Sequence, residues 1–244
     1  NYTVYDLNTK KSQLITNYDW DTQGNNGWTY FPAWSPDGKE VVYMYSDWFI
    51  EKTELHISNL QGEERTLLTT ESSAQVIPRQ WANEGDNILT YVQDSTGYYT
   101  IAIVSAIDGT ISPLLKTQWN GKLITGDASI SPDGKYIVYA DGPADNLDLF
   151  IIDTKGGVPS KISNYPTNEF KPLWSPDGEY IVYIKETKRE ALLYGLPMKG
   201  EKPAGQAYMI RQGMQNVSLN NWTEQGICYS VLVELRDIYT LPLD

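Results

Sequence analysis

The chain has 244 residues, and 41% of them are hydrophobic, which is enough to bury a substantial core. No apolar run approaches the roughly 18 residues that a membrane helix needs, so we expect no membrane insertion. The 19 basic and 31 acidic residues leave a net charge of −12. This balance argues against a nucleic-acid partner, because phosphate binding depends on Lys and Arg, and it favours basic partners.

The first predicted strands lie within residues 2–16. Their sequence, YTVYDLNTKKSQLIT, aligns without a gap with LFIIDTKGGVPSKIS at 149–163, so that Asp6 matches Asp153 and Thr16 matches Ser163. The chain therefore begins with the second half of a structural unit that returns later in full.

A long connection follows at residues 17–30, NYDWDTQGNNGWTY, where a later copy of the unit has only NYPTNEF. An insertion on one rim of a repeat protein is often functional, and exposed tryptophans suggest a surface that a partner covers. We therefore predict a binding face in this connection, with the alternative that its tryptophans fold back onto the protein as a lid. The candidate residues are Asp19, Trp20, Asp21, Trp28 and Tyr30.

Calcium is the one cofactor that the sequence leaves open. Asp19, Asp21 and Gln23 match the start of a calcium-binding loop, but Tyr30 stands at the twelfth position, where a bidentate Glu is wanted. An ordinary turn built by Asp and Gly is the alternative. No other cofactor is predicted.

A short phrase then recurs along the chain. FPAWSPDG at 31–38 returns as ASISPDG at 128–134 and KPLWSPDG at 171–178, with weaker copies at 78–85 and 219–226. The anchor positions of the five copies are 47, 49, 44 and 48 residues apart, a spacing typical of the four-stranded blades of a β-propeller. The anchors are Trp34, Trp81, Ile130, Trp174 and Trp222.

Each unit is predicted to contain four antiparallel strands and no helix. The sequence Ser-Pro-Asp-Gly suits a tight turn, since Pro presets φ and Gly accepts a positive φ. The strand after the turn, for example Ile181-Val182-Tyr183, is apolar on both faces, as expected of a strand that neighbouring blades cover on both sides. We therefore expect the four anchor tryptophans to be equivalent by rotation and buried between blades.

The number of blades remains open between five and six. The predicted strands number two at the start, sixteen in four full units and three in the last, and 21 strands are one more than five blades need and three fewer than six. Residues 12–16 could close a fifth blade, because strands from both termini commonly complete one blade. Alternatively, sequence outside residues 1–244 supplies three strands of a sixth blade. We favour six blades in a single domain that is a segment of a longer protein.

The repeated Pro-x-Trp-Ser-Pro-Asp-Gly, the Ile-Val-Tyr strand and the later LFIIDTKGG resemble the repeat of TolB-like β-propellers, distant relatives of WD-repeat proteins. The resemblance covers nearly the whole chain, although the third copy has Ile130 in place of Trp. It implies a bacterial or archaeal origin, an extracytoplasmic setting such as the periplasm, and a domain that binds proteins or precedes a catalytic domain. No activity follows, since one propeller fold hosts many functions.

The polar residues just before each anchor are the second candidate site, because the first strand of every propeller blade lines the axial channel. They differ between units while the scaffold repeats, so they could bind a small ligand or a peptide end; a wetted channel lining is the alternative. These residues are Arg79, Gln80, Asp127, Lys171, Asn220 and Asn221.

The one histidine and an acidic stretch at 140–148 are not assigned to a catalytic or binding site. His56, the one histidine, lies in the predicted strand ELHISNL, so we expect it in a blade wall rather than in a catalytic triad. The acidic stretch ADGPADNLD at 140–148 contains Asp141, Asp145 and Asp148. We expect solvated loop charges there, with a metal site as the alternative.

Two classes of function remain. The first is a non-catalytic binding or scaffold module, monomeric, whose rim loops and channel mouth recognise a protein or peptide partner. The second is the gating or substrate-selecting propeller of a larger enzyme, such as a prolyl oligopeptidase or a tricorn-like protease. The chain shows no catalytic motif, so we predict the first class and no enzyme activity in this segment.

Overall fold

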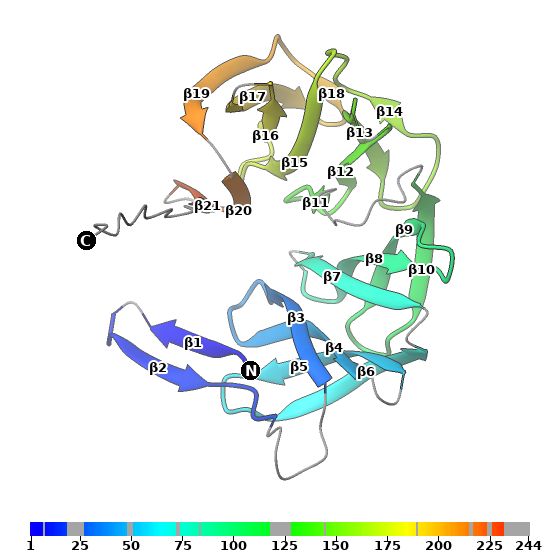
Figure 1. The fold of residues 1–244 in the computed structure, drawn as a ribbon, viewed down its shortest axis with the longest axis vertical. Helices are drawn as coiled ribbons and strands as arrows, with labels where there is room; N and C mark the ends of the chain where they lie inside the picture. The colour runs from blue at the N-terminus through cyan, green and yellow to red at the C-terminus, as the bar shows by residue number, and fades with distance from the viewer. Residues whose placement is uncertain are drawn as a thin grey trace, which may run out of the picture.

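The computed structural model describes residues 1–6, 8–18, 27–47, 51–71, 74–82, 84–117, 128–143, 145–188, 190–214, 217–223 and 226–231. Every regular element in these ranges is a β-strand, which confirms the predicted all-β class. Four sheets of four or five antiparallel strands follow one another around an arc, with a two-stranded hairpin at each end (Figure 1). These ranges contain no helix that is long and apolar enough to span a bilayer.

The four sheets correspond to four of the predicted repeat units, and we name them the first to fourth blades. The first blade contains β3 (Gly27–Trp34), β4 (Glu40–Asp47), β5 (Lys52–Asn59) and β6 (Glu64–Glu71). The second contains β7 (Gln75–Trp81), β8 (Asn87–Gln93), β9 (Tyr99–Ser105) and β10 (Ile111–Lys116). The third contains β11 (Ala128–Ile130), β12 (Tyr136–Asp141), β13 (Asp148–Asp153) and β14 (Ser160–Lys161).

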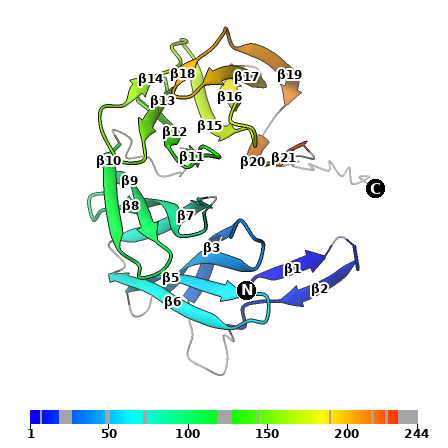
Figure 2. The ribbon, with the colours of Figure 1, turned by 180° about the vertical axis from the view of Figure 1, so that it is seen from behind.

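The fourth blade has an additional short strand. It contains β15 (Asn168–Trp174), β16 (Tyr180–Glu186), β17 (Ala191–Lys199), β18 (Lys202–Pro203) and β19 (Tyr208–Met214). The N-terminal hairpin is β1 (Thr3–Asp6) with β2 (Lys11–Leu14), and the C-terminal hairpin is β20 (Val217–Thr223) with β21 (Gly226–Val231). Both hairpins lie on the same side of the arc, as the front and rear views show (Figures 1 and 2).

The Ser-Pro-Asp-Gly turn joins the first and second strands of three blades. In the first blade, the Ser35 hydroxyl donates a hydrogen bond to Asp37 and accepts one from the Glu40 amide, at 2.8 and 2.9 Å. Gly38 has a φ of 69°, which glycine adopts without strain. The bonds from Ser131 to Asp133 and from Ser175 to Asp177 repeat this turn. The tight turn predicted from the phrase is therefore a self-contained local structure.

The hydrophobic core lies between successive blades. Val42 of the first blade packs in one cluster with Trp81 of the second, and Tyr139 of the third packs with Tyr91 of the second. Val138 and Trp174 share a cluster between the third and fourth blades. The strands after the turns are thus covered on both faces, as predicted.

The anchor tryptophans are not equivalent. Trp81 and Trp174 are buried as predicted, but Trp34 is 47% exposed. Each buried anchor packs against the blade before it: the Trp81 indole N–H donates to the Ala33 carbonyl at 3.0 Å, for example. Among the described residues, only the N-terminal hairpin precedes Trp34 in the chain, and it packs around Val41 and Tyr43 instead. The predicted burial of Trp34 is therefore wrong, because within the described residues no inner strand of a preceding blade covers the indole.

The prediction of solvated charges at 140–148 is also wrong in part. Asp145 is exposed, but Asp141 and Asp148 are buried. These two residues face each other across the antiparallel pair β12–β13, so the strand ends carry both carboxylates into the interior. The third strand predicted for the last unit lies outside the described residues, and the blade number remains a prediction.

Candidate functional site

The inner strands of the blades surround a central cavity. Strands β3, β7, β11, β15 and β20 lie nearest the centre of the arc (Figure 1). Their ends enclose a cavity of about 720 Å³ that residues from four blades and the C-terminal hairpin line. The lining includes Trp34, Arg79, Gln80, Trp81, Trp174 and Trp222. All four anchor tryptophans thus meet at this cavity, and Trp34 contributes the most exposed ring.

A β-bulge interrupts each longer inner strand just before its anchor. The ladder register shifts between Tyr30 and Ala33, Pro78 and Gln80, Phe170 and Leu173, and Leu219 and Asn221. The predicted channel residues Arg79, Lys171 and Asn220 fall inside three of these bulges. A bulge bends a strand and redirects a side chain, so this local device acts on Arg79 in the second blade and on Lys171 in the fourth.

The bulge in the fourth blade carries backbone strain. Lys171 has a φ of 54° and Phe31, at the equivalent position of the first blade, has a φ of 58°. Non-glycine residues rarely adopt this left-handed region, and such strain persists where the surrounding structure enforces it.

The polar groups of this region connect neighbouring blades. The Gln80 side-chain oxygen accepts a hydrogen bond from the Ile130 amide at 3.1 Å, and the Lys171 ammonium donates one to Ser218 at 2.7 Å. Burial lowers the pKa of Arg79, and burial together with the charge of Arg79 lowers the pKa of Lys171. Arg79 and Gln80 line the cavity, whereas Lys171 reaches across to the C-terminal hairpin.

The predicted rim residues separate into three groups. Trp28 and Tyr30 belong to strand β3 rather than to a loop, because Trp28 pairs with Ser46 and Tyr30 with Met44 of β4. Trp28 is 52% exposed, whereas Tyr30 packs against the core between the first and second blades. The remaining candidates lie outside the described residues: Asp19, Trp20, Asp21, Gln23 and Asp127.

Trp28 does not meet the central cavity. It lies six positions before Trp34 in the same strand, and at about 3.3 Å per residue this separates them by roughly 20 Å along the strand. The exposed indole therefore stands at the opposite end of the inner strand from the cavity that Trp34 lines.

His56 is a structural residue in the first blade, as predicted. Its Nδ1 lies 2.8 Å from Glu64 and its Nε2 lies 3.1 Å from Glu54. The hydroxyls of Tyr18 and Tyr43 also donate to Glu64. Burial opposes ionisation of Glu64, but the hydrogen bonds from His56, Tyr43 and Tyr18 outweigh it and lower its pKa to about 2. We name these five residues the His56 cluster; its polar contacts tie Tyr18, which follows the N-terminal hairpin, to the first blade.

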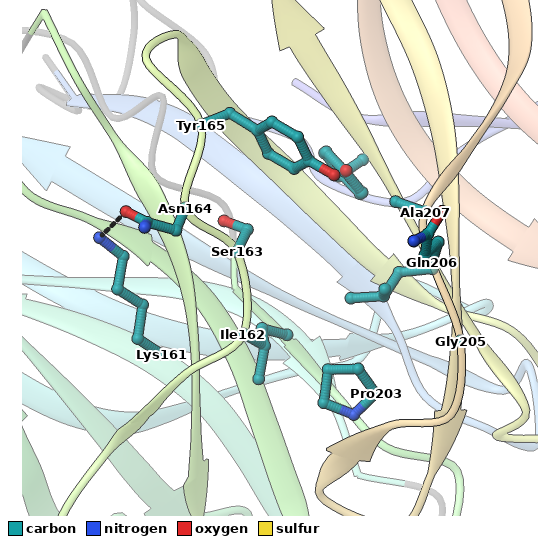
Figure 3. A pocket seen from close by; sticks show the side chains of 11 residues that line it. Lys161, Ile162, Ser163, Asn164, Tyr165, Pro203, Gly205, Gln206 and Ala207 are labelled. Carbon is teal, nitrogen blue, oxygen red and sulfur yellow. Dashed lines mark hydrogen bonds between the residues drawn. The ribbon is translucent and has the colours of Figure 1, made fainter.

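A second pocket, of about 700 Å³, lies between the third and fourth blades (Figure 3). Its walls come from residues 161–165, which begin at the end of β14, from residues within 203–207, which begin at the end of β18, and from Tyr183 and Leu196. Lys161 turns toward Asn164 and donates a hydrogen bond to it at 3.1 Å (Figure 3). The Lys185 ammonium lies 3.5 Å from the ring centre of Tyr165, so this basic side chain is held by a cation–π contact. No feature of the sequence indicated this pocket.

Known proteins with the same architecture include enzymes and TolB itself. A 183-residue stretch is 25% identical to the uncharacterized peptidase YuxL of Bacillus subtilis (strain 168), covering 57% of this chain and 27% of YuxL. TolB of Acinetobacter baumannii has a TM-score of 0.59 at 21% identity, over 85% of this chain and 49% of that chain. An oligogalacturonate lyase in complex with manganese has a TM-score of 0.64 at 16% identity, over 92% of this chain and 65% of that one.

These matches limit which properties of known proteins can be assigned to this chain. The chain spans about a quarter of the length of YuxL and about half of that TolB, and the structural matches show the fold alone. The family model of the TolB beta propeller domain matches residues 1–202. Together with the Ser-Pro-Asp-Gly turns and the four sheets arranged around a cavity, this match shows that the chain belongs to the TolB beta-propeller family.

Proposed function

We propose that this propeller is a non-catalytic binding domain that holds a segment of a protein or peptide partner in its central cavity. The observation that carries the proposal is the half-exposed Trp34 facing a cavity of about 720 Å³ together with the half-buried Trp222. Large aromatic side chains in a concave, partly apolar site are the usual anchors of a binding interface.

The polar lining supports recognition of an extended segment. Gln80 and Arg79 line the same cavity as the indoles, so a bound chain would meet both apolar rings and hydrogen-bonding groups. The redirected bulge residues differ from blade to blade, which is where a repeat scaffold acquires specificity. We expect no nucleic-acid partner, a monomeric domain and an extracytoplasmic setting.

A second candidate is the gating or substrate-selecting propeller of a larger enzyme. The similarity to the peptidase YuxL favours it. In that case the same cavity would meet a peptide substrate, and the chemistry would reside elsewhere in the longer polypeptide. Both candidates require that residues 1–244 alone hydrolyse neither peptides nor esters.

The test compares two exposed tryptophans of the same strand. Partners captured from the native host are identified with wild-type protein, and the affinity of each purified partner is then measured for Trp34→Ala and for Trp28→Ala. Loss of an interface anchor typically weakens binding by 2 kcal/mol or more, about thirtyfold in Kd. We expect this loss for Trp34→Ala and little change for Trp28→Ala. If only Trp28→Ala loses the partner, the binding face is the rim and not the cavity.

A further inference from the structure

A pair of buried carboxylates lies at the seam between the third and fourth blades. Asp148 begins β13 and is 5% exposed; Glu169, the second residue of β15, is fully buried. The two segments run side by side, because the Glu169 amide donates to the Leu147 carbonyl and the Leu147 amide donates to the Asn168 side chain, both at 2.9 Å. We name this region the seam site.

The oxygens of the seam site have no hydrogen-bond partner among the described residues. They are both carboxylate oxygens of Glu169, Oδ1 of Asp148 and the hydroxyl oxygen of Thr167. Leaving even one buried polar group unpaired costs on the order of 1–3 kcal/mol, and an ionised carboxylate costs more. Four unpaired oxygens on two segments that run side by side therefore point to a ligand that binds between these segments.

The nearby lysines do not supply that ligand. Lys161 lies 2.6 Å from the other oxygen of Asp148 and also donates to Asn164. Lys185 rests on the rings of Tyr165 and Tyr194, at 3.5 and 5.3 Å. Burial raises the pKa of Glu169, and the charge of Asp148 adds to this effect, while the nearby Ser163 hydroxyl and the charges of Lys185 and Lys161 do not offset it.

We propose that the seam site binds a calcium ion through the unpaired oxygens of Asp148, Thr167 and Glu169. Carboxylate and hydroxyl oxygens form a hard donor set, and calcium accepts six to eight oxygens in irregular geometry, whereas magnesium demands a near-ideal octahedron. No group of three or more His, Cys, Asp or Glu side chains gathers in the described part of the chain. Water or backbone oxygens must therefore complete the coordination.

The second pocket adjoins the seam site. Lys161 and Ser163 line that pocket (Figure 3), and both act on the seam site: Lys161 pairs with Asp148, and the Ser163 hydroxyl accepts the Leu149 amide at 2.8 Å. An ion entering there would cross-link strands of two blades. The site is separate from the calcium loop predicted at Asp19, Asp21 and Gln23.

The experiment measures calcium binding and thermal unfolding of the chelator-treated protein, with magnesium and sodium at matched ionic strength as separate arms. A ligand present at a hundredfold excess over its Kd raises Tm by about 5 °C or more in a chain of this size. We expect this shift with calcium, a stoichiometry near one ion per chain by titration calorimetry, and a smaller effect of magnesium.

Three variants locate the site. Glu169→Gln keeps the side-chain shape and should abolish both the calcium shift and the binding isotherm while leaving Tm without calcium unchanged or higher. Glu54→Gln alters a buried carboxylate of the His56 cluster, and Asp19→Asn with Asp21→Asn alters the predicted loop. Both of these controls should retain the full calcium shift.

Three results overturn the proposal. The first is a wild-type protein that calcium neither binds nor stabilises. The second is an equal calcium shift in wild-type and Glu169→Gln protein, and the third is a shift that disappears in the Asp19 and Asp21 double variant but persists in Glu169→Gln. A Glu169→Gln protein that is more stable at every calcium concentration, with no wild-type response, would identify the occupant as a proton and not a metal.

Discussion

The His56 cluster and the seam site are both groups of ionisable side chains packed within the blades, and they are built in opposite ways. In the His56 cluster, His56 and Glu54 are buried, whereas the Glu64 side chain is 29% exposed. In the His56 cluster, each ring nitrogen of His56 faces a carboxylate within 3.1 Å, and two tyrosine hydroxyls donate to Glu64. In the seam site, Glu169 is fully buried and neither of its carboxylate oxygens has a partner among the described residues.

This difference distinguishes a cluster that stabilises the fold from a cluster that is suited to bind a ligand. A buried polar network whose members are all satisfied fixes one arrangement of the chain, and here it joins Tyr18 to the first blade. A buried charge without a partner is costly, so its presence calls for an occupant or for a proton. The two regions therefore predict opposite responses to the same kind of substitution.

The largest effect is expected in the His56 cluster. His56→Phe keeps an aromatic ring but removes the two ring nitrogens that face Glu54 and Glu64. Without the imidazole, Glu54 keeps its contacts with Lys52 and Thr69. Glu64 keeps the hydrogen bonds from Tyr18 and Tyr43. The substitution therefore removes two hydrogen bonds to charged groups, at a cost of about 2 kcal/mol. Chemical denaturation at pH 6 should show this loss in the free energy of unfolding. A change below the measurement error would mean that the contacts of His56 with the two glutamates do not contribute to stability.

Glu169→Gln should have a smaller effect of the opposite sign. Without calcium, the substitution replaces a fully buried and unpaired acid by an amide that carries no charge. We expect the free energy of unfolding to rise by about 1 kcal/mol at pH 8. A loss of stability similar to that of His56→Phe would show that Glu169 has a partner.

The dependence of stability on pH distinguishes the two clusters again. The pKa of Glu64 falls from 4.5 to about 2, so its stabilisation is complete above pH 4.5 and is lost as the pH falls toward 2. Burial opposes the charge of His56, but Glu64 and Glu54 raise its pKa above 6.5. The contribution of His56 is thus complete below pH 6.5 and is lost as the pH rises through the folded pKa. The His56 cluster is most stabilising between about pH 4.5 and 6.5.

Glu169 behaves in the reverse way. Its pKa is raised above 4.5, mainly by burial, so the folded state becomes costlier as the pH rises from 4.5 through the folded pKa. The free energy of unfolding, measured by denaturation from pH 3 to 9 without calcium, should therefore decline at high pH in the wild-type protein. Glu169→Gln should remove one part of this decline, and His56→Phe should remove another. Identical pH profiles of wild-type and Glu169→Gln protein would show that Glu169 titrates as an exposed acid.

The repeat could be predicted from the sequence because its turn depends only on residues that are adjacent in the chain. Ser35, Asp37 and Gly38 form the turn from their own hydrogen bonds and φ, so the pattern indicated both strands around it. The exposure of Trp34 was not readable, since the cover of an anchor comes from the preceding blade, about 45 residues away in the chain.

The candidate sites were predicted less completely for a related reason. The position of Arg79 and Gln80 beside the cavity could be predicted because every inner strand of a propeller approaches the axis. Glu169 gave no signal, because the segment NEF that begins β15 reads as an ordinary polar rim, and its burial arises only when the third blade docks against it. Asp148 was noticed in an acidic stretch but was assigned to solvent for the same reason.

The smallest expected effect concerns two buried tryptophans that differ in their hydrogen bonding. Trp81 and Trp174 are both nearly buried between blades, but the Trp81 indole N–H donates to the Ala33 carbonyl, whereas the Trp174 indole N–H has no hydrogen-bond partner among the described residues. Replacing either with Phe removes a similar apolar area and the indole N–H. Trp81→Phe also leaves the Ala33 carbonyl without its donor, so it should cost about 1 kcal/mol more than Trp174→Phe. Denaturation of the two variants side by side measures this difference, and a double variant shows whether the sites are independent. Equal losses would mean that the Trp174 indole N–H donates to an acceptor in solution, such as a water molecule, and that an unpaired buried group in this fold does not by itself identify a ligand.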